Sequence, residues 1–277
     1  MTDAGRLVVV RGAGDIATGV IQKLVHAGFK VLALEVAQPM AIRWRAALCT
    51  AVREGRWSVE DLVGVRVGSW DEASAVLGEG QVPVLVDPEA SVLDAARPIA
   101  LVDAVLAKRN VGTTRAMADV VVGLGPGFSA GDDAHYVVET MRGHDLGRVI
   151  TAGPALPNTG VPGLIAGRAA ERVLHAPIAG IVSVRRGIGE VVEAGEVVCT
   201  IASEAEAGEA VDVRASIGGV VRGMIPDGYR VRARFKIADV DPRTELAGSV
   251  DTISDKSRAI GGGALDAVLQ GLGGWRP

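Results

Sequence analysis

A glycine-rich turn near the start of the chain has the residue types and spacing of a phosphate-binding loop. Gly12-Ala13-Gly14-Asp15-Ile16-Ala17 follows the pattern G-x-G-x-x-G/A. The first glycine of this pattern permits a tight turn, the second lets a pyrophosphate reach the backbone, and the small last residue lets helix and strand pack closely. Free N–H groups at the start of the following helix then attract the phosphate. The pattern predicts a dinucleotide or nucleotide site here, and a turn that binds nothing is the alternative.

An acidic residue stands where such a site needs one. Glu35 ends the next apolar run, 23 residues after Gly12, and a carboxylate at this distance typically accepts hydrogen bonds from a ribose. Because a 2′-phosphate would meet this carboxylate, Glu35 favours NAD over NADP. Asp15 acts in the opposite direction, since its charge weakens anion binding unless its side chain caps the helix instead.

Two further loops follow predicted strands and carry suitable groups. Gly125 and Gly127 lie in a second glycine cluster directly after the run at 120–122. Lys108 and Arg109 lie in a basic loop that also holds two threonines, which suits a phosphate or carboxylate ligand. Ligands of open α/β sheets bind beyond the carboxyl ends of the strands, so these loops are expected to face the same crevice as Gly12. A flexible turn and a solvated basic loop are the alternatives.

Catalytic groups are harder to find. His144 beside Asp145 is the one candidate for a general base, although consecutive residues rarely aim at one point. The sequence has no G-x-S-x-G motif for a serine nucleophile and no H-E-x-x-H or C-x-x-C motif, so we expect no metal site. Whether any reaction is catalysed is left open.

The elements that must position these residues indicate an α/β fold. Of the 277 residues 48% are apolar and 22% are charged, which fits a folded globular chain. Apolar runs predict buried strands at 7–10, 31–34, 82–87, 99–106 and 119–124. Helical patterns follow residue 15, cover 41–56, and are expected over 131–142. Strands that alternate with helices predict a Rossmann-like, mostly parallel sheet.

The second half of the chain contains an internal repeat. Ala176, Gly180, Gly189 and Val192 recur after 39 residues as Ala215, Gly219, Gly228 and Val231. This spacing resembles the two halves of a biotinyl/lipoyl-like barrel-sandwich hybrid, a small all-β domain. The connection between the repeats, residues 202–214, contains no lysine, so neither biotin nor lipoate is expected as a cofactor. We predict domains at 1–165 and 174–245, with a tail at 246–277 that docks on the first.

Composition also bears on location and partners. The net charge of −4 argues against nucleic acid as a partner. No apolar run approaches the ~20 residues that a membrane span needs, and the first residues lack the apolar region of a signal peptide. Two cysteines, Cys49 and Cys199, suit a reducing compartment. We expect a cytoplasmic protein, and sparse charge in the repeat leaves homo-oligomerisation open.

Several long motifs, in one order along nearly the whole chain, resemble one family. They are RGAGDIATG at 11–19, AKRNVGT at 107–113, GLGPGFSAG at 123–131, ETMRGHDLGRVI at 139–150, PNTGVPG at 157–163, DGYRV with KIADVDPR at 227–243, and ISDKSRAIGGGALDAVL at 253–269. They resemble the YqeB-type accessory proteins of selenium-dependent molybdenum hydroxylase systems. The chain departs from that pattern at Arg43-Trp44-Arg45, where consecutive arginines are expected, and at Asp266, where glutamate is expected.

The resemblance implies an accessory role in maturing molybdenum hydroxylases, with a Rossmann-like domain and an apo-hydroxylase as partner. It supplies no reaction. The ligand expected from the glycine turn is NAD or the dinucleotide form of the molybdenum cofactor. Two alternatives stay open: an NAD-dependent oxidoreductase of a small molecule, with His144 beside the nicotinamide, and an interaction protein whose glycine turns are structural.

Overall fold

The chain divides into two units with separate buried cores. Residues 6–160, 163–204, 208 and 210–273 are described by the computed structural model. One unit consists of Met1–Pro39, Ala47–Thr159 and Ile253–Pro277, and the other of Met40–Ala46 and Gly160–Thr252. Parts of two expected features lie outside the described residues, namely 161–162 in the motif at 157–163 and 205–207 with 209 in the connection between the repeats.

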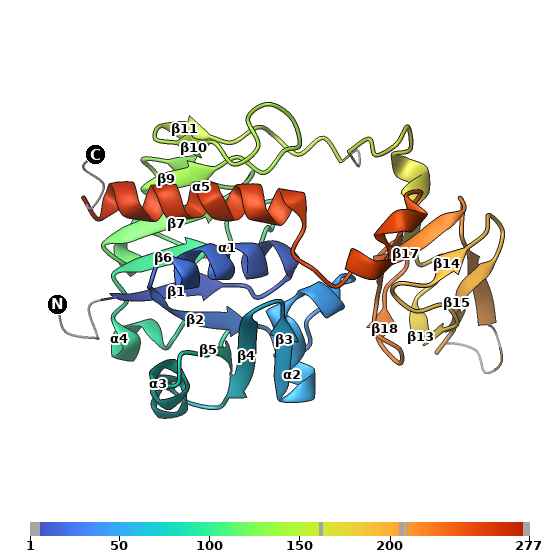
Figure 1. The fold of residues 1–277 in the computed structure, drawn as a ribbon, viewed down its shortest axis with the longest axis horizontal. Helices are drawn as coiled ribbons and strands as arrows, with labels where there is room; N and C mark the ends of the chain where they lie inside the picture. Colours follow the sequence, from blue (N-terminus) through green and yellow to red (C-terminus); the bar gives the residue numbers. More distant parts are fainter. Residues whose placement is uncertain (1–5, 161–162, 205–207, 209, 274–277) are drawn as a thin grey trace. The chain divides into compact units, whose positions relative to one another are not determined.

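A nine-stranded mixed sheet forms the centre of the first unit (Figure 1), in the order β10-β9-β7-β6-β1-β2-β5-β4-β3. All inner strands pair in parallel, and β3 and β10 pair antiparallel at the two edges. The strands are β1 (Leu7–Arg11), β2 (Lys30–Glu35), β3 (Arg56–Val59), β4 (Leu62–Val67), β5 (Val82–Val86), β6 (Ala100–Asp103), β7 (Val120–Leu124), β9 (Tyr136–Val138) and β10 (Val149–Ile150). A separate two-stranded sheet pairs β8 (Ser129–Ala130) with β11 (Gly153–Pro154).

Helices cover both faces of this sheet. Figure 1 shows α1 and α5 side by side on one face. On the other face, α3 packs Ala73 and Leu77 against apolar side chains of β1 and β2. The helices are α1 (Asp15–His26), α2 (Ala51–Glu54), α3 (Trp70–Gly78), α4 (Leu93–Ala96) and α5 (Asp255–Gly271). Because both faces are covered, β1 is buried along its whole length, as its unbroken apolar run predicts.

Glycines let α1 and α5 approach closely. A Cβ atom on Gly19 of α1 would lie 2.5 Å from the carbonyl oxygen of Ser257, and one on Gly261 of α5 would overlap the carbonyl oxygen of Gly19. Gly261 also faces Lys23, so contacts advance along both helices in the same direction. The helices therefore run parallel, and their first turns lie at the same end of the sheet.

The second unit consists of two four-stranded antiparallel sheets, β12-β19-β17-β14 and β16-β15-β13-β18. One apolar core, with Val182, Ile201, Val221 and Ile237 at its centre, joins the two sheets. The strands are β12 (Val173–His175), β13 (Gly180–Val184), β14 (Val191–Val192), β15 (Val197–Ala202), β16 (Ala210–Arg214), β17 (Gly219–Met224), β18 (Arg230–Val231) and β19 (Lys236–Asp241).

The repeat of 39 residues is visible in the pairing of these strands. The N–H of Gly189 donates to the carbonyl of Val221 at 2.8 Å, and the N–H of Gly228 donates to that of Val182 at 2.9 Å. Each repeat thus pairs with the other in the same way. Neither repeat buries its apolar face alone, which explains why two copies make one unit.

The fold class predicted from the sequence is wrong. Instead of a Rossmann-like domain, the first unit has a large mixed sheet. Its inner strands are parallel, but both edge strands are antiparallel and several connections contain no full helix. The second unit forms two separate antiparallel sheets rather than a biotinyl/lipoyl-like barrel-sandwich hybrid. An apolar run indicates a strand but not the direction of its neighbour, because pairing is set by residues distant in sequence.

Individual elements fared differently. The strands predicted at 82–87, 99–106 and 119–124 are confirmed as β5, β6 and β7. The helix expected over 131–142 is wrong, since this segment holds β9 and turns. The helical pattern at 41–56 yields only the short helix α2 and two 3₁₀ turns. Helix α5, which no helical pattern above covers, continues through the triple glycine Gly261–Gly263.

Candidate functional site

The turn between β1 and α1 leaves its backbone open at Gly14. A Cβ atom placed on Gly14 would meet nothing within 4 Å, and Gly14 is the N-cap residue of α1 with no side chain capping the helix. Gly12 is required by the fold instead, because its φ is +94° and a Cβ there would lie 2.9 Å from the carbonyl oxygen of Ala104. The first glycine thus shapes the turn, and the second exposes its backbone.

Hydrogen bonds hold this turn from two directions. The N–H of Ala13 donates to Oε2 of Glu35 at 2.9 Å, and the carbonyl of Ala13 accepts from the N–H of Cys49 at 2.8 Å. Thr18, buried one turn into α1, accepts from the N–H of Leu48 at 3.0 Å. The turn is therefore fixed before any ligand arrives.

Glu35 lies against the turn at the end of β2. Its other oxygen, Oε1, accepts from the N–H of Val36 at 2.8 Å. Burial raises the pKa of the Glu35 carboxyl, while the two backbone hydrogen bonds from Val36 and Ala13 act in the opposite direction. Each carboxylate oxygen has more than one lone pair, so these bonds still allow Glu35 to accept from a ligand hydroxyl.

The remaining motif residues lie in the first turn of α1. Asp15 is the first helical residue, and Gly14 before it is the N-cap residue of α1. Ile16 and Ala17 are buried, 8% and 1% exposed. Ala17 therefore serves close packing, and the ligand-facing part of the motif is reduced to Gly14 and the backbone beside it.

Basic side chains from distant segments accompany Asp15. Lys256, in the first turn of α5, is half-buried, and burial followed by the charge of Arg142 lowers its pKa, whereas Asp15, Glu139 and Asp255 act to raise it. Arg142 donates to both carboxylate oxygens of Asp255, at 3.0 and 3.1 Å. Lys256 thus offsets the charge of Asp15 that the sequence alone set against anion binding.

Glu139 arranges the loop that carries Arg142. Its Oε1 accepts from the N–H groups of Thr140 and Met141, both at 2.7 Å, and its Oε2 accepts from the N–H of Leu156 at 2.8 Å. Only 3% of Glu139 is exposed. This carboxylate therefore organises backbone rather than offering itself to a ligand.

A buried ion pair anchors the basic loop after β6. Arg11, the last residue of β1, contacts Asp103, the last residue of β6, at 3.2 Å, and both bond the hydroxyl of Thr113. Arg11 also donates to the carbonyl of Pro88 at 2.8 Å. The loop from 104 to 113 is therefore tied to the carboxyl ends of the central strands.

This loop presents its cations outward. Lys108 and Arg109 are exposed, and so are the apolar side chains of Val105, Leu106 and Val111. The backbone of Arg109 lies 3.0 Å from a Cβ placed on Gly127, whose φ is +111°. The basic loop and the second glycine cluster are thus packed together, and the loop is apolar as well as basic.

The second glycine cluster is occupied with packing. Gly125 has a φ of +76°, and a Cβ there would overlap the Thr140 hydroxyl. Gly125 and Gly127 therefore bring loops together rather than leaving backbone open as Gly14 does. His144 is exposed in the turn after β9. Its role as a general base stays a prediction.

The described residues contain no group of three or more His, Cys, Asp or Glu side chains placed to hold a metal ion. Both cysteines are buried and free, and burial raises their thiol pKa, that of Cys199 to about 11. A buried, protonated thiol is a poor nucleophile. At the carboxyl ends of the central strands, the structure has open backbone at Gly14 and basic side chains on neighbouring segments.

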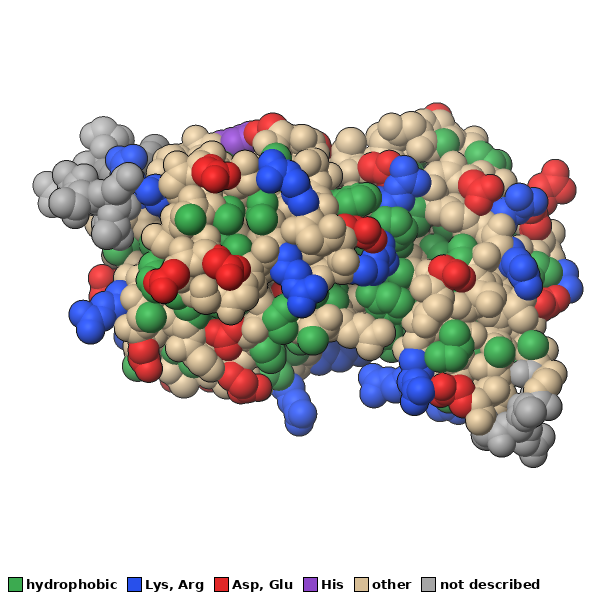
Figure 2. All heavy atoms as spheres, turned by 90° about the horizontal axis from the view of Figure 1, so that it is seen from below, with side chains coloured by type: hydrophobic (Ala, Val, Ile, Leu, Met, Phe, Trp, Pro, Cys, Tyr) green, Lys and Arg blue, Asp and Glu red, His purple; other side chains and the backbone are tan. Residues whose placement is uncertain are grey.

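Sequence reasoning identified the glycine turns, Glu35 and the basic loop, but it missed Lys256 and Arg142. The motif around Lys256 gave no basis for assigning a role, because its relation to Asp15 arises only when α5 packs on α1. In the described part of the chain, no helix is long and apolar enough to cross a membrane. On the face drawn in Figure 2, acidic and basic side chains are interspersed rather than gathered by sign.

Comparison with known proteins gives one strong match. The chain is 47% identical over 264 residues to the uncharacterized protein YqeB of Escherichia coli (strain K12), covering 95% of this chain and 47% of that protein. The chain therefore spans about half the length of the curated relative it matches. This likeness makes it a relative of YqeB, whose description states no activity. No family model matches the chain.

Similarity to solved structures is weak. An aspartoacylase family protein from Mesorhizobium loti is 14% identical, with 84% of each chain covered and a TM-score of 0.31. A succinylglutamate desuccinylase/aspartoacylase from Rhodobacter sphaeroides is 17% identical, with 85% of each chain covered and the same score. At such scores the likeness carries no argument about function.

Proposed function

With its relationship to YqeB as the premise, we propose that this chain is an accessory protein for the maturation of selenium-dependent molybdenum hydroxylases. It binds a dinucleotide, either NAD or the dinucleotide form of the molybdenum cofactor, and docks on the apo-hydroxylase. The hydroxylase role comes from the motifs that run along the sequence. The binding role comes from the glycine turn and its surroundings.

The open backbone at Gly14 is the observation that carries the binding proposal. A phosphate can approach the first turn of α1 only if no side chain fills that space, and nothing lies within 4 Å of a Cβ placed on Gly14. Glu35, held beside Ala13 by a hydrogen bond, supports the proposal as the group that accepts from a ribose. These residues fit the phosphate and sugar of a dinucleotide, with Asp15 as the opposing charge.

Cations around this edge support the same ligand. Lys256 lies within electrostatic range of Asp15, and Lys108 and Arg109 are exposed on the loop tied to β1 by Arg11. Positive side chains of this kind lend charge to bound phosphates. Because both thiols are buried with raised pKa values, the proposal gives this chain the carrying or presenting of a ligand rather than its transformation through a cysteine.

Calorimetric titration tests the proposal directly. The purified protein is titrated with NAD, with NADP, and with the cytosine and guanine dinucleotide forms of the molybdenum cofactor. The same titrations are made with Gly14→Val and with a matched control, Gly78→Val. Gly78 is also open within 4 Å but lies at the end of α3. We expect saturable binding of at least one dinucleotide that Gly14→Val abolishes and Gly78→Val retains.

The compound that binds distinguishes NAD from the dinucleotide form of the molybdenum cofactor as the ligand. A pull-down with an apo-hydroxylase tests the docking step. Binding that survives in Gly14→Val would place the ligand elsewhere. If none of the four compounds binds, the dinucleotide role fails, and the chain is then better explained as an interaction protein.

A further inference from the structure

The first unit contains a cavity at the opposite end of the sheet from Gly14. It has a volume of about 400 Å³ and is bordered by Val120 and Tyr136, the first residues of β7 and β9. Gly271, at the end of α5, forms another part of its wall, and a Cβ there would lie 2.6 Å from the side chain of Val120. This volume is at the small end of ligand sites, roughly 300–1,000 Å³.

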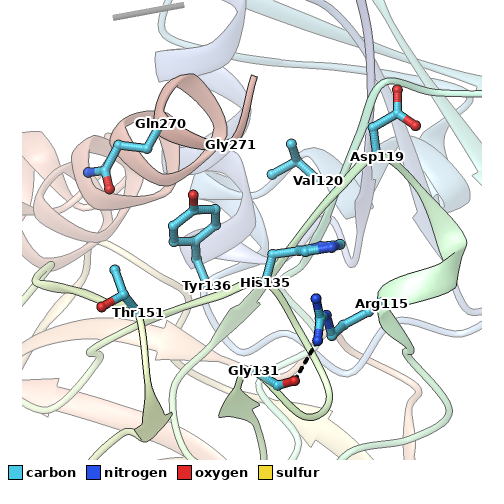
Figure 3. A pocket seen from close by; sticks show the side chains of 9 residues that line it. All are labelled: Arg115, Asp119, Val120, Gly131, His135, Tyr136, Thr151, Gln270 and Gly271. Atoms are coloured by element: carbon cyan, nitrogen blue, oxygen red, sulfur yellow. Dashed lines mark hydrogen bonds between the residues drawn. The ribbon is translucent and has the colours of Figure 1, made fainter. Parts of the chain in front are cut away.

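The cavity is lined by hydrogen-bond donors from separate segments (Figure 3). Arg115 and His135 lie on one side of it, and Tyr136, Thr151 and Gln270 lie on the other. Arg115 donates one N–H to the carbonyl of Gly131 at 2.6 Å, which fixes the guanidinium. Because a guanidinium has five N–H donors, this bond leaves most of them for a ligand.

A backbone hydrogen bond selects one tautomer of the neutral His135 ring. Its Nδ1 accepts from the backbone N–H of Val121 at 2.9 Å, so in the neutral ring the hydrogen is on Nε2. Its own backbone N–H donates to the carbonyl of Val121 at 2.8 Å, which locks the residue to β7. Burial, and then the charge of Arg115, lowers the pKa of the imidazole. At neutral pH His135 therefore contributes one N–H and no charge.

We propose that this cavity binds a small molecule through an oxyanion, a carboxylate or a phosphate group, held by Arg115 and by the Nε2–H of His135. A guanidinium held in place beside a second N–H donor matches the oxygens of such a group. Tyr136, Thr151 and Gln270 provide polar contacts for the rest of the ligand. Because the cavity lies where β7 and β9 begin, whereas Gly14 follows the end of β1, this site is independent of the one at Gly14.

Substituting Asp119 should change anion binding in the direction opposite to substituting Arg115. It is exposed and also lines the cavity, and its carboxylate repels an anion. Removing the charge of Arg115 should weaken binding, whereas removing that of Asp119 should strengthen it. A structural role for either residue would not produce changes in opposite directions.

The full-length protein is titrated with inorganic phosphate and, separately, with succinate, followed by calorimetry and by the NMR signals of His135. We expect one of these probes to saturate and to shift the Nε2–H signal of His135. Arg115→Gln should weaken its binding at least about tenfold, as loss of a charged hydrogen bond predicts. Asp119→Asn should tighten binding, and the exposed control Arg97→Gln should leave it unchanged.

The probe that binds tells phosphate from carboxylate. Gly78→Val, at the end of α3 and outside this cavity, should bind it as the unmodified protein does. The proposal is overturned if neither probe saturates, or if Arg115→Gln and Asp119→Asn both bind like the unmodified protein. Should Arg115→Gln fail to fold, the result with Asp119→Asn alone decides, since Asp119 is exposed.

Discussion

Glu35, the last residue of β2, and Ala13, in the turn after β1, are joined by a hydrogen bond of 2.9 Å from the backbone N–H of Ala13 to Oε2 of Glu35. The carboxylate that the sequence assigned to a ribose therefore also holds the glycine turn. The two roles are compatible, because the turn and the sugar-binding group are then fixed relative to each other. A ligand meets a site that is already organised.

This relationship leads to a prediction about nucleotide selectivity. In Glu35→Gln the negative charge is lost, so a 2′-phosphate is no longer repelled. If a nicotinamide dinucleotide is the ligand, the ratio of NAD to NADP affinities should fall about tenfold or more, equivalent to about 1.4 kcal/mol. Calorimetry with both compounds measures the ratio. Glu79→Gln, at an exposed glutamate after α3, is the control, and an unchanged ratio would remove Glu35 from the sugar site.

The two glycines of the first turn should respond differently to the same substitution. Gly12→Ala adds a methyl group 2.9 Å from the carbonyl of Ala104 at a φ of +94°, so it should cost more than about 2 kcal/mol of unfolding free energy. Gly14→Ala enters open space and should cost less than about 1 kcal/mol, the scale of an N-cap change. Urea denaturation of the two variants decides, and equal losses would contradict this division of roles.

Local sequence signals predicted part of the fold well. The first strand, helix and strand follow from apolar runs and from a glycine turn that are contiguous in sequence. Gly28 has the positive φ, +85°, expected just after a helix. The antiparallel edges of the sheet could not be predicted in this way. The helix expected over 131–142 failed because its short strand, β9, is stabilised by pairing with β7 rather than by its own pattern.

The candidate site divides in the same way. Gly14 and Glu35 are recognisable because they keep fixed spacing around one turn. Lys256 comes to Asp15 from 241 positions further along the chain. No local pattern marks that approach, because it depends on glycines of α1 and α5 that let two helices touch. Repeated glycines in a helical segment were the one available signal of such a contact.

The triple glycine of α5 gives a matched pair of stability predictions. Gly261→Ala would force a methyl group into the carbonyl of Gly19, so α1 and α5 must separate and the protein should lose about 2 kcal/mol or more. Gly262→Ala meets nothing within 4 Å and should gain about 0.5–1 kcal/mol, because alanine favours the helix interior. Thermal unfolding of both variants tests this, and a loss of stability in Gly262→Ala would mean that α5 packs differently.

The buried pair of Arg11 and Asp103 should matter far more than a surface pair. Asp103 is 1% exposed, so Asp103→Ala leaves the Arg11 guanidinium buried without its carboxylate and should cost about 3–5 kcal/mol. The loop from 104 to 113 should also become sensitive to proteolysis. Asp145→Ala, which breaks an exposed pair with Arg148, should cost less than about 1 kcal/mol. Similar losses in the two variants would contradict the anchoring role.

Protonation of His135 should make stability depend on pH in a defined window. The folded protein lowers the imidazole pKa, so just below the unfolded pKa of about 6.5 the unfolded chain binds more protons. Stability should therefore fall as the pH drops from about 6.5, because the charged ring is partly buried near Arg115 and a protonated Nδ1 can no longer accept from Val121.

The carboxyl groups of Glu60 and Asp61 affect stability only at a lower pH than His135. Their pKa values are lowered in the folded protein, so their contribution is lost only as the pH falls below about 4.5. Denaturant titrations between pH 7 and pH 5, compared between the unmodified protein and His135→Asn, separate the contribution of His135 from that of Glu35, whose pKa is raised in the folded protein. In His135→Asn, whose amide oxygen can replace Nδ1 as acceptor, the slope in this window should become shallower. A slope equal to that of the unmodified protein would show that His135 binds protons equally in both states, contrary to its contact with Val121.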